Sequence, residues 1–265
     1  MELIVNIIIF ILGTSVGSFL NVVIKRLPIN QSIIFPRSKC MNCNNQIAWY
    51  DNIPLVSWLL LKGKCRNCNN RIEINYFLIE FFMGTSFLII NSNNQAIYGG
   101  LSGLQDNLLS WILISILLPL FILDYKYLWL PSSIIFCGLI TGIIFILIYS
   151  FHFDSYLYLQ NISAAFIGLI CFLLLSEAGK MIFKKPSLGY GDAKLCGLMG
   201  LWLGYQGLFL AIYLSFILSG LVCIVLLSLK KIERHSKVPF GPFMIVSTLS
   251  VWFLGIDFFK NVYLL

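Results

Sequence analysis

The sequence predicts an all-α polytopic membrane protein with about eight transmembrane helices and one small polar domain. Three observations support this fold class. Of the 265 residues, 59% are apolar and 11% are charged, whereas soluble proteins have about 45–50% apolar and about 25% charged residues. Apolar stretches close to the roughly 20 residues that span a bilayer recur along the chain. A single polar segment separates the first two stretches and contains two CxxC pairs.

The apolar stretches give the candidate spans in order. They are 3–24, 74–90, 108–123, 133–149, 157–177, 193–203, 208–229 and 240–256. The sixth is short and Gly-rich, so we expect it to be tilted, broken or partly re-entrant. The first differs from a secretory signal because Glu2 stands where a basic region belongs and Lys25 and Arg26 follow it. We therefore expect a retained anchor.

Basic residues predict the orientation of these spans. The loops after the first, third, fifth and seventh spans contain Lys or Arg, whereas the loops 91–107, 150–156 and 204–207 contain neither. Since short loops rich in Lys and Arg stay in the cytoplasm, both termini are predicted to face outward. The net charge of +7 follows from this topology and from contact with anionic lipid, so it gives no support to nucleic-acid binding.

The polar segment 25–75 contains Cys40, Cys43, Cys65 and Cys68. Each CxxC pair offers two thiolates from one tight turn, and two such turns complete the four-sulfur shell of a structural zinc site. Disulfides are the competing interpretation, but thiols in the cytoplasm are normally kept reduced. The sequence thus predicts a small cytoplasmic zinc-binding domain between helices one and two. The predicted division is a first transmembrane helix, this tetracysteine domain and a membrane-embedded domain, at 1–24, 25–75 and 76–265.

Carboxylates inside membrane segments are costly and are therefore candidates for function. Asp124 closes the third span and Asp192 opens the sixth, and the predicted topology places both at the cytoplasmic face. Two carboxylates about 4 Å apart repel by about 4 kcal/mol at an effective dielectric of about 20, so one is expected to hold a proton while the other stays ionised. Such a pair can activate water against a peptide carbonyl. In the competing interpretation, each aspartate caps a helix end or binds Lys126 or Lys194.

Several motifs resemble one family. Residues 188–192, Leu-Gly-Tyr-Gly-Asp, resemble the GxGD signature of intramembrane aspartyl proteases. Other segments are similar, in the same order, to type IV prepilin leader peptidases: residues 17–24, 26–28, 49–59 within the CxxC framework, Asp124 with Leu130-Pro131, and Pro239-Phe240-Gly241-Pro242-Phe243. Ser132 follows Pro131 where many family members have an aspartate, which favours Asp124 as the first catalytic residue.

The resemblance implies a multi-pass endopeptidase of the bacterial cytoplasmic (inner) membrane that removes the leader of prepilin or pseudopilin substrates. Full-length members also methylate the new amino terminus with S-adenosylmethionine. The resemblance assigns catalysis to Asp124 and Asp192, support to Gly189, Tyr190, Gly191 and Lys194, and a methyl-donor site to Asn21, Arg26 and Glu80. For the last three, a structural role in helix packing is an equal alternative.

Two other functions use the same features. A transporter can use intramembrane carboxylates for proton coupling, and a thiol redox carrier can use CxxC pairs. Transport predicts carboxylates near the bilayer midplane and an inverted repeat, and the sequence shows neither. Glu177 lies three residues before Lys180, which predicts an ion pair at a helix end in place of a functional carboxylate.

Overall fold

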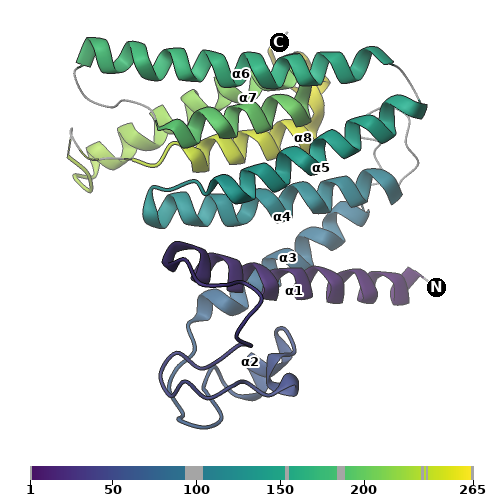
Figure 1. Cartoon of the computed structure of the whole chain (residues 1–265), viewed down its shortest axis with the longest axis vertical. Coiled ribbons are helices and arrows are strands. Elements are labelled where there is room, and N and C mark those ends of the chain that lie inside the picture. The colour runs from purple at the N-terminus through teal and green to yellow at the C-terminus, as the bar shows by residue number, and fades with distance from the viewer. Residues whose placement is uncertain are drawn as a thin grey trace. The chain divides into compact units, whose positions relative to one another are not determined.

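A computed structural model describes residues 2–92, 104–152, 155–183, 189–233, 236 and 238–263. The long helices are α1 (Glu2–Arg26), α3 (Ile74–Ser92), α4 (Leu104–Tyr127), α5 (Ser132–His152), α6 (Ser155–Phe183), α7 (Tyr190–Ser228) and α8 (Gly241–Tyr263) (Figure 1). The shorter ones are η1 (Leu27–Ile29), η2 (Trp49–Asn52) and α2 (Val56–Leu60). No strand occurs in the described ranges, which confirms the all-α fold class.

Most of these helices are apolar enough to cross a membrane. The segments that meet the length and hydropathy of a span are Glu2–Ile29, Ile74–Ser92, Asn107–Tyr127, Leu159–Ile182 and Tyr190–Ser228, with shorter apolar helices at Ser132–Leu147 and Gly241–Ile256. Each of these helices corresponds to one or two of the predicted spans. An apolar segment in a membrane forms a helix because no water is present there to hydrogen-bond its backbone N–H and C=O groups. The chain is a multi-pass membrane protein.

Helix α7 contains the predicted sixth and seventh spans, and it is broken at Gly204. That residue has φ 65° and ψ −172°, a conformation that glycine adopts readily. Trp202, before the break, contacts Trp252 of α8 with 5.6 Å between ring centroids, whereas Phe216, after it, lies 5.1 Å from Phe240, just before α8. The chain therefore reverses direction at Gly204, as two spans require.

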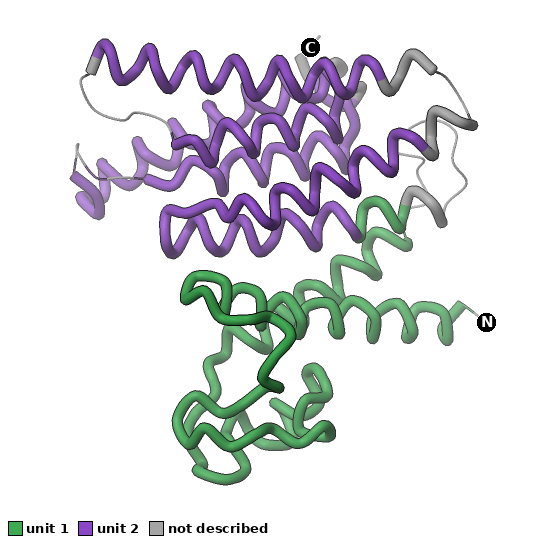
Figure 2. The backbone as a smooth tube through the Cα atoms, in the orientation of Figure 1, with its two compact units in different colours: residues 1–96, 101–111 green, residues 97–100, 112–265 purple. Residues whose placement is uncertain are grey.

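The chain forms two compact units (Figure 2). Unit 1 comprises Met1–Ala96 and Leu101–Trp111, and unit 2 comprises Ile97–Gly100 and Ile112–Leu265. Units defined by packing are not functional domains, so the three-part division drawn from the sequence stays a prediction.

In unit 1, helices α1 and α3 pack closely through small residues. A Cβ atom added to Gly17 would lie 2.8 Å from the Cα atom of Glu80, which shows how near the two backbones approach. This approach fixes the position of α3 against α1 and holds the intervening polar segment at their common end.

In unit 2, Trp202 is the centre of a buried aromatic cluster. Its ring lies 5.8 Å from that of Phe145 in α5 as well as 5.6 Å from that of Trp252 in α8. The indole N–H donates to the carbonyl of Gly138, 3.1 Å away, so the polar edge of this buried ring is satisfied. Helices α5, α7 and α8 are thereby fixed against one another, which positions the start of α7, where Asp192 lies, and the start of α8, which contacts Asp124.

Candidate active sites

Asp124 lies in the last turn of α4 and is 6% exposed. Its Oδ2 atom accepts a hydrogen bond of 3.0 Å from the N–H of Gly241, the first residue of α8. The first amides of a helix have no partner within the helix, so a carboxylate there satisfies one and interacts favourably with the helix dipole. A Cβ atom on residue 241 would lie 2.6 Å from this Oδ2, so a side chain there would displace the carboxylate or the start of α8.

Asp192 is held in a similar way at the start of α7. Its Oδ2 accepts a hydrogen bond of 3.1 Å from the N–H of Gly189, the residue that caps this helix. The charge of Asp192 acts on Asp124, so the two carboxylates lie within electrostatic range of each other. The structure thus brings together in unit 2 the two aspartates that the sequence analysis singled out.

Gly191 and Lys194, on either side of Asp192, both contact the region where α5 begins. A Cβ atom on Gly191 would lie 2.9 Å from the Cβ of Leu130, so a side chain here would push α7 away from the segment before α5. The ammonium group of Lys194 donates to Ser132 Oγ at 2.7 Å. Lys194 therefore joins α7 to the first residue of α5.

Tyr190 ties α7 to the end of α6. Its hydroxyl donates to Glu177 Oε1 at 3.0 Å and accepts from Lys180 Nζ at 2.8 Å. The predicted ion pair between Glu177 and Lys180 is confirmed, with 2.6 Å between Nζ and Oε1. The family resemblance gave Tyr190 only a supporting role. The hydroxyl network could not be predicted from the sequence, because the two helix ends are brought together only by the fold.

The four paired cysteines form a compact cluster in unit 1. Their sulfur atoms all lie within 4.8 Å of one another, and the Cys40 and Cys68 sulfurs are 3.8 Å apart. All four are free thiols, so the disulfide interpretation gains no support. Four zinc–sulfur bonds of about 2.3 Å in a tetrahedron place the sulfurs about 3.8 Å apart. The cluster therefore has the ligands and the dimensions to hold a metal ion.

The two CxxC turns repeat each other in sequence and conformation. Residues 40–45 and 65–70 both read Cys-x-Asn-Cys-Asn-Asn. In each turn the N–H of the first cysteine donates to the carbonyl of the last asparagine, at 3.0 Å and 2.9 Å. Asn44 and Asn69 have φ of 58° and 56°, a left-handed conformation that asparagine tolerates. Backbone N–H groups of Cys43 and Asn42 point at the Cys40 sulfur and lower its pKa to about 6, which favours the ligating thiolate.

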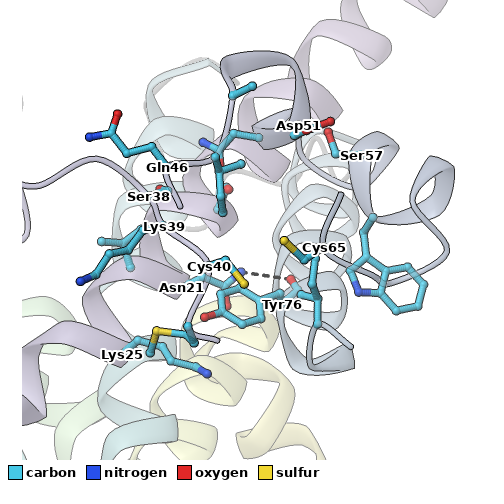
Figure 3. A pocket seen from close by; sticks show the side chains of 18 of the residues that line it. Asn21, Lys25, Ser38, Lys39, Cys40, Gln46, Asp51, Ser57, Cys65 and Tyr76 are labelled. Carbon is cyan, nitrogen blue, oxygen red and sulfur yellow. Dashed lines mark hydrogen bonds between the residues drawn. The ribbon is translucent and has the colours of Figure 1, made fainter. Parts of the chain in front are cut away.

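A cavity of about 1000 Å³ lies between this cluster, α1 and α3 (Figure 3). Asn21, Arg26 and Glu80 all line it, so the three residues named for a methyl-donor site share one space. Each also makes a structural bond. Asn21 Nδ2 donates to the Tyr76 carbonyl at 3.0 Å, and Arg26 donates to the carbonyl of Ser32 at 2.9 Å. Glu80 Oε2 accepts a hydrogen bond of 2.8 Å from the N–H of Leu55.

Arg66 and Asp51 connect the cysteine cluster to the cavity. Arg66 lies inside the second CxxC turn and donates two hydrogen bonds, of 2.8 Å and 2.7 Å, to the carboxylate of Asp51 in η2. The hydrogen bonds from the guanidinium hold the pKa of Asp51 below its usual range. This pair was not predicted from the sequence. The available signal was an arginine between the two cysteines of a CxxC pair, with an aspartate in the enclosed loop.

Two family profiles match the chain. "Bacterial Peptidase A24 N-terminal domain" covers residues 11–93, and "Type IV leader peptidase family" covers residues 111–224. The first range contains the cysteine cluster with Asn21, Arg26 and Glu80, and the second contains both aspartates. The chain resembles these families over most of its length.

Similar proteins include three named "Prepilin leader peptidase/N-methyltransferase". The protein from Myxococcus xanthus is 34% identical over 75% of this chain and 56% of its own length. That from Aeromonas salmonicida is 30% identical over 91% of this chain and 87% of its own length. The protein from Stutzerimonas stutzeri is 32% identical over 89% of this chain and 86% of its own length. No solved structure matches the chain.

Proposed function

Since this chain belongs to the type IV leader peptidase family, we propose that it cleaves prepilin or pseudopilin substrates at the cytoplasmic face of the bacterial inner membrane, with Asp124 and Asp192 as its catalytic pair. One observation carries the proposal. Two carboxylates from distant parts of the chain are each held by the first amides of a helix, and they lie within electrostatic range of each other. Neither transport nor thiol redox chemistry gains support from the relatives.

The chemistry is hydrolysis without a covalent intermediate. The ionised aspartate takes a proton from a water molecule, whose oxygen attacks the carbonyl carbon of the scissile peptide bond. The protonated aspartate gives its proton to the carbonyl oxygen, and a tetrahedral intermediate forms. The C–N bond then breaks as the aspartate that took the proton from water gives it to the departing amine, and a hydroxyl of the intermediate returns a proton to the other aspartate. One protonated and one ionised aspartate are thereby restored. Repulsion between two neighbouring carboxylates favours this shared-proton state.

The hydrogen bonds from Gly241 and Gly189 orient the pair. Within the part of the chain that the structure describes, the hydrogen bonds to Asp124 and Asp192 involve one oxygen of each carboxylate. The other oxygen of each is left for water and substrate. Fixed carboxylates need no reorganisation during proton transfer, which is how a preorganised site lowers the barrier.

The second function is N-methylation of the new amino terminus, and we place it in the cavity of unit 1. Asn21, Arg26 and Glu80 line that cavity, whose volume of about 1000 Å³ suits a nucleoside-sized molecule together with a chain terminus. S-adenosylmethionine, when bound, supplies the methyl group. The carboxylate of Glu80 suits a cationic amine, and the amide of Asn21 and the guanidinium of Arg26 suit polar groups of either molecule.

The metal of the cysteine cluster is zinc with a structural role. Four thiolates form the closed tetrahedral shell typical of structural zinc sites, and such a shell leaves no position for substrate. Because Cys40 and Cys65 line the cavity, a zinc ion bound to them would stabilise the cavity wall. The 3.8 Å separation of the Cys40 and Cys68 sulfurs supports this assignment.

Mass spectrometry of a prepilin incubated with the purified protein tests both activities together. The expected products are a leader peptide and a mature chain that begins at its hydrophobic helix. Addition of S-adenosylmethionine is expected to add one methyl group to the mature chain and to leave the cleavage position unchanged. An intact prepilin under conditions in which a characterised relative cleaves it would overturn the peptidase assignment.

A further inference from the structure

Helix α2 has an inverted distribution of polarity. Val56, Leu59 and Leu60, which share one face by their spacing, are 48%, 58% and 77% exposed. Ser57, on the other side, is 7% exposed and donates to the carbonyl of Tyr50. A short helix in water places its apolar side chains inward. Here Ser57 lies inside with the ring of Trp58, and the face formed by Val56, Leu59 and Leu60 points away from the protein.

The segment that carries α2 is attached to α3 inside the apolar length of that helix. The N–H of Leu55 donates to Glu80 Oε2 at 2.8 Å, and Trp58 lies 5.0 Å from Phe77 between ring centroids. At a rise of about 1.5 Å per residue, Glu80 lies about 9 Å along α3 from Ile74, the first residue of the candidate membrane span. Helices that lie in a membrane interface bury their apolar faces by about 5–10 Å, so the attachment is at the depth of such helices.

The apolar surface of the segment continues onto α3. The ring of Phe77 packs against Trp58 on one side and stacks with Phe81 on the other, with 6.1 Å between the two phenylalanine centroids. Phe81 is 46% exposed and lies in a candidate membrane span, where lipid is its natural neighbour. A row of aromatic rings thus leads from α2 to the membrane-spanning part of α3.

The charges near α2 suit an anionic headgroup region. Lys62 and Lys64 follow the helix directly and are exposed. The acid of the segment, Asp51, is neutralised by its two hydrogen bonds to Arg66. Trp49, 80% exposed, adds an amphipathic ring of the kind enriched where hydrocarbon meets headgroups. Cationic residues next to an apolar face are typical of membrane-surface helices.

We propose that the segment 49–64 lies in the membrane interface, with Trp49, Val56, Leu59 and Leu60 in contact with lipid acyl chains and Lys62 and Lys64 among anionic headgroups. The segment also lines the cavity of unit 1, through Tyr50, Ile53 and Trp58 among others. One wall of that cavity consequently lies next to lipid. This inference rests on the contacts of unit 1 and does not depend on the catalytic assignments.

A photoreactive diazirine residue at position 60 tests the proposal. The full-length protein is reconstituted into vesicles of phosphatidylethanolamine and phosphatidylglycerol and illuminated, and the adducts are identified by mass spectrometry. The same residue at position 37 is the matched control. The carbonyl of Arg37 accepts a hydrogen bond from Arg26 at the basic end of α1, and its side chain is exposed. Replacing that side chain therefore leaves the backbone contact unchanged.

The expected result is a ratio of lipid to water adducts several-fold higher at position 60 than at position 37. Equal ratios would overturn the proposal, because the α2 face would then lie in water. Cross-links from position 60 mainly to residues of this chain or of a second copy would overturn it too, because a protein surface would then cover the face.

Quenching of Trp49 fluorescence gives an independent measurement. The difference in emission between the wild-type protein and Trp49→Phe isolates the signal of Trp49. We expect lipids with a nitroxide near the glycerol ester to quench that signal and a water-soluble quencher to have a smaller effect. The opposite order would place Trp49 in water and contradict the proposal.

Discussion

The two units hold their polar groups in different ways. In unit 2, each aspartate is fixed by the first amide of a helix and by glycines that leave room for it. In unit 1, the cavity wall is a loop segment held by long side chains and by the four cysteines. Helix packing therefore determines the geometry of the proposed peptidase site, whereas the cysteine cluster and side-chain contacts determine that of the cavity. A change to the aspartates or their glycines should therefore reduce cleavage and spare methylation, whereas a change to the cysteines should reduce methylation and spare cleavage.

Removal of either carboxylate should give the largest effect. Asp124→Asn or Asp192→Asn is expected to lower the rate of leader removal by at least about 100-fold, since an amide cannot serve as general acid or base. Metal content should not change. The measurement is the rate of prepilin cleavage in membranes.

Glu233→Gln is the matched control for this pair, because Glu233 is an exposed carboxylate of the same unit and its hydrogen bond to Ser236 comes from the backbone N–H. It should cleave at close to the wild-type rate. Full cleavage by Asp124→Asn or Asp192→Asn would exclude the dyad.

Removal of the metal should affect the other unit alone. Cys40→Ser combined with Cys43→Ser is expected to reduce the zinc content from about one ion per chain to near zero, because two of four ligands are lost. Methylation should be lost with it, and cleavage should persist. Elemental analysis and mass spectrometry of the product give the two readouts.

Cys171→Ser, a change of an exposed cysteine in α6, is the control and should retain zinc. Active wild-type enzyme that contains no zinc would contradict a structural metal. Loss of cleavage together with zinc would show that the two units do not fail separately.

Gly241→Ala should lower cleavage by a smaller factor. The new Cβ atom would lie 2.6 Å from Asp124 Oδ2, so the carboxylate or the start of α8 must move. Overpacking of this kind costs about 1–3 kcal/mol, and the same loss of transition-state stabilisation corresponds to about 5- to 150-fold in rate. Gly220→Ala, where a Cβ atom meets nothing within 4 Å, should leave the rate unchanged. Equal rates for the two variants would show that the Gly241 contact does not position Asp124.

Loss of the contact between Asp51 and Arg66 should have the smallest effect on function. Asp51→Asn is expected to weaken S-adenosylmethionine binding by less than about fivefold, since Arg66 is largely exposed and such pairs contribute little. Because Arg66 lowers the pKa of Asp51 in the folded protein, the contribution of the pair is present above the ordinary aspartate pKa and is lost as pH falls through the lowered one. Zinc content should not change, and binding is measured by calorimetry. Loss of zinc would mean that the pair supports the metal cluster itself.

Much of the fold follows from the sequence alone. Apolar stretches define the helices, and Gly204 marks the break between two predicted spans. The charge pattern placed Asp124 and Asp192 at one level of the membrane, which was enough to expect a pair. The repeated Cys-x-Asn-Cys-Asn-Asn turn is visible in the sequence but was not predicted, because CxxC spacing alone does not specify the left-handed conformation that Asn44 and Asn69 adopt.

The rest depends on contacts that no local pattern reveals. The hydrogen bond between Gly241 and Asp124 joins residues 117 positions apart, and that between Asn21 and Tyr76 spans 55 positions. Such bonds follow from how whole helices pack, and sequence periodicity does not fix that packing. The cavity was unforeseen for the same reason, although Asn21, Arg26 and Glu80 had been named together.

The break at Gly204 has a consequence for the lipid around unit 2. At the rise of an α-helix, the stretch from Tyr190 to Leu203 covers about 21 Å, whereas the hydrocarbon core of a bilayer is about 30 Å thick. A short span in a thick membrane is accommodated by local thinning of the bilayer. Around the first half of α7 the leaflets should therefore be compressed, and a substrate helix that spans the thicker surrounding bilayer would have to tilt or shift along its axis to approach Asp192.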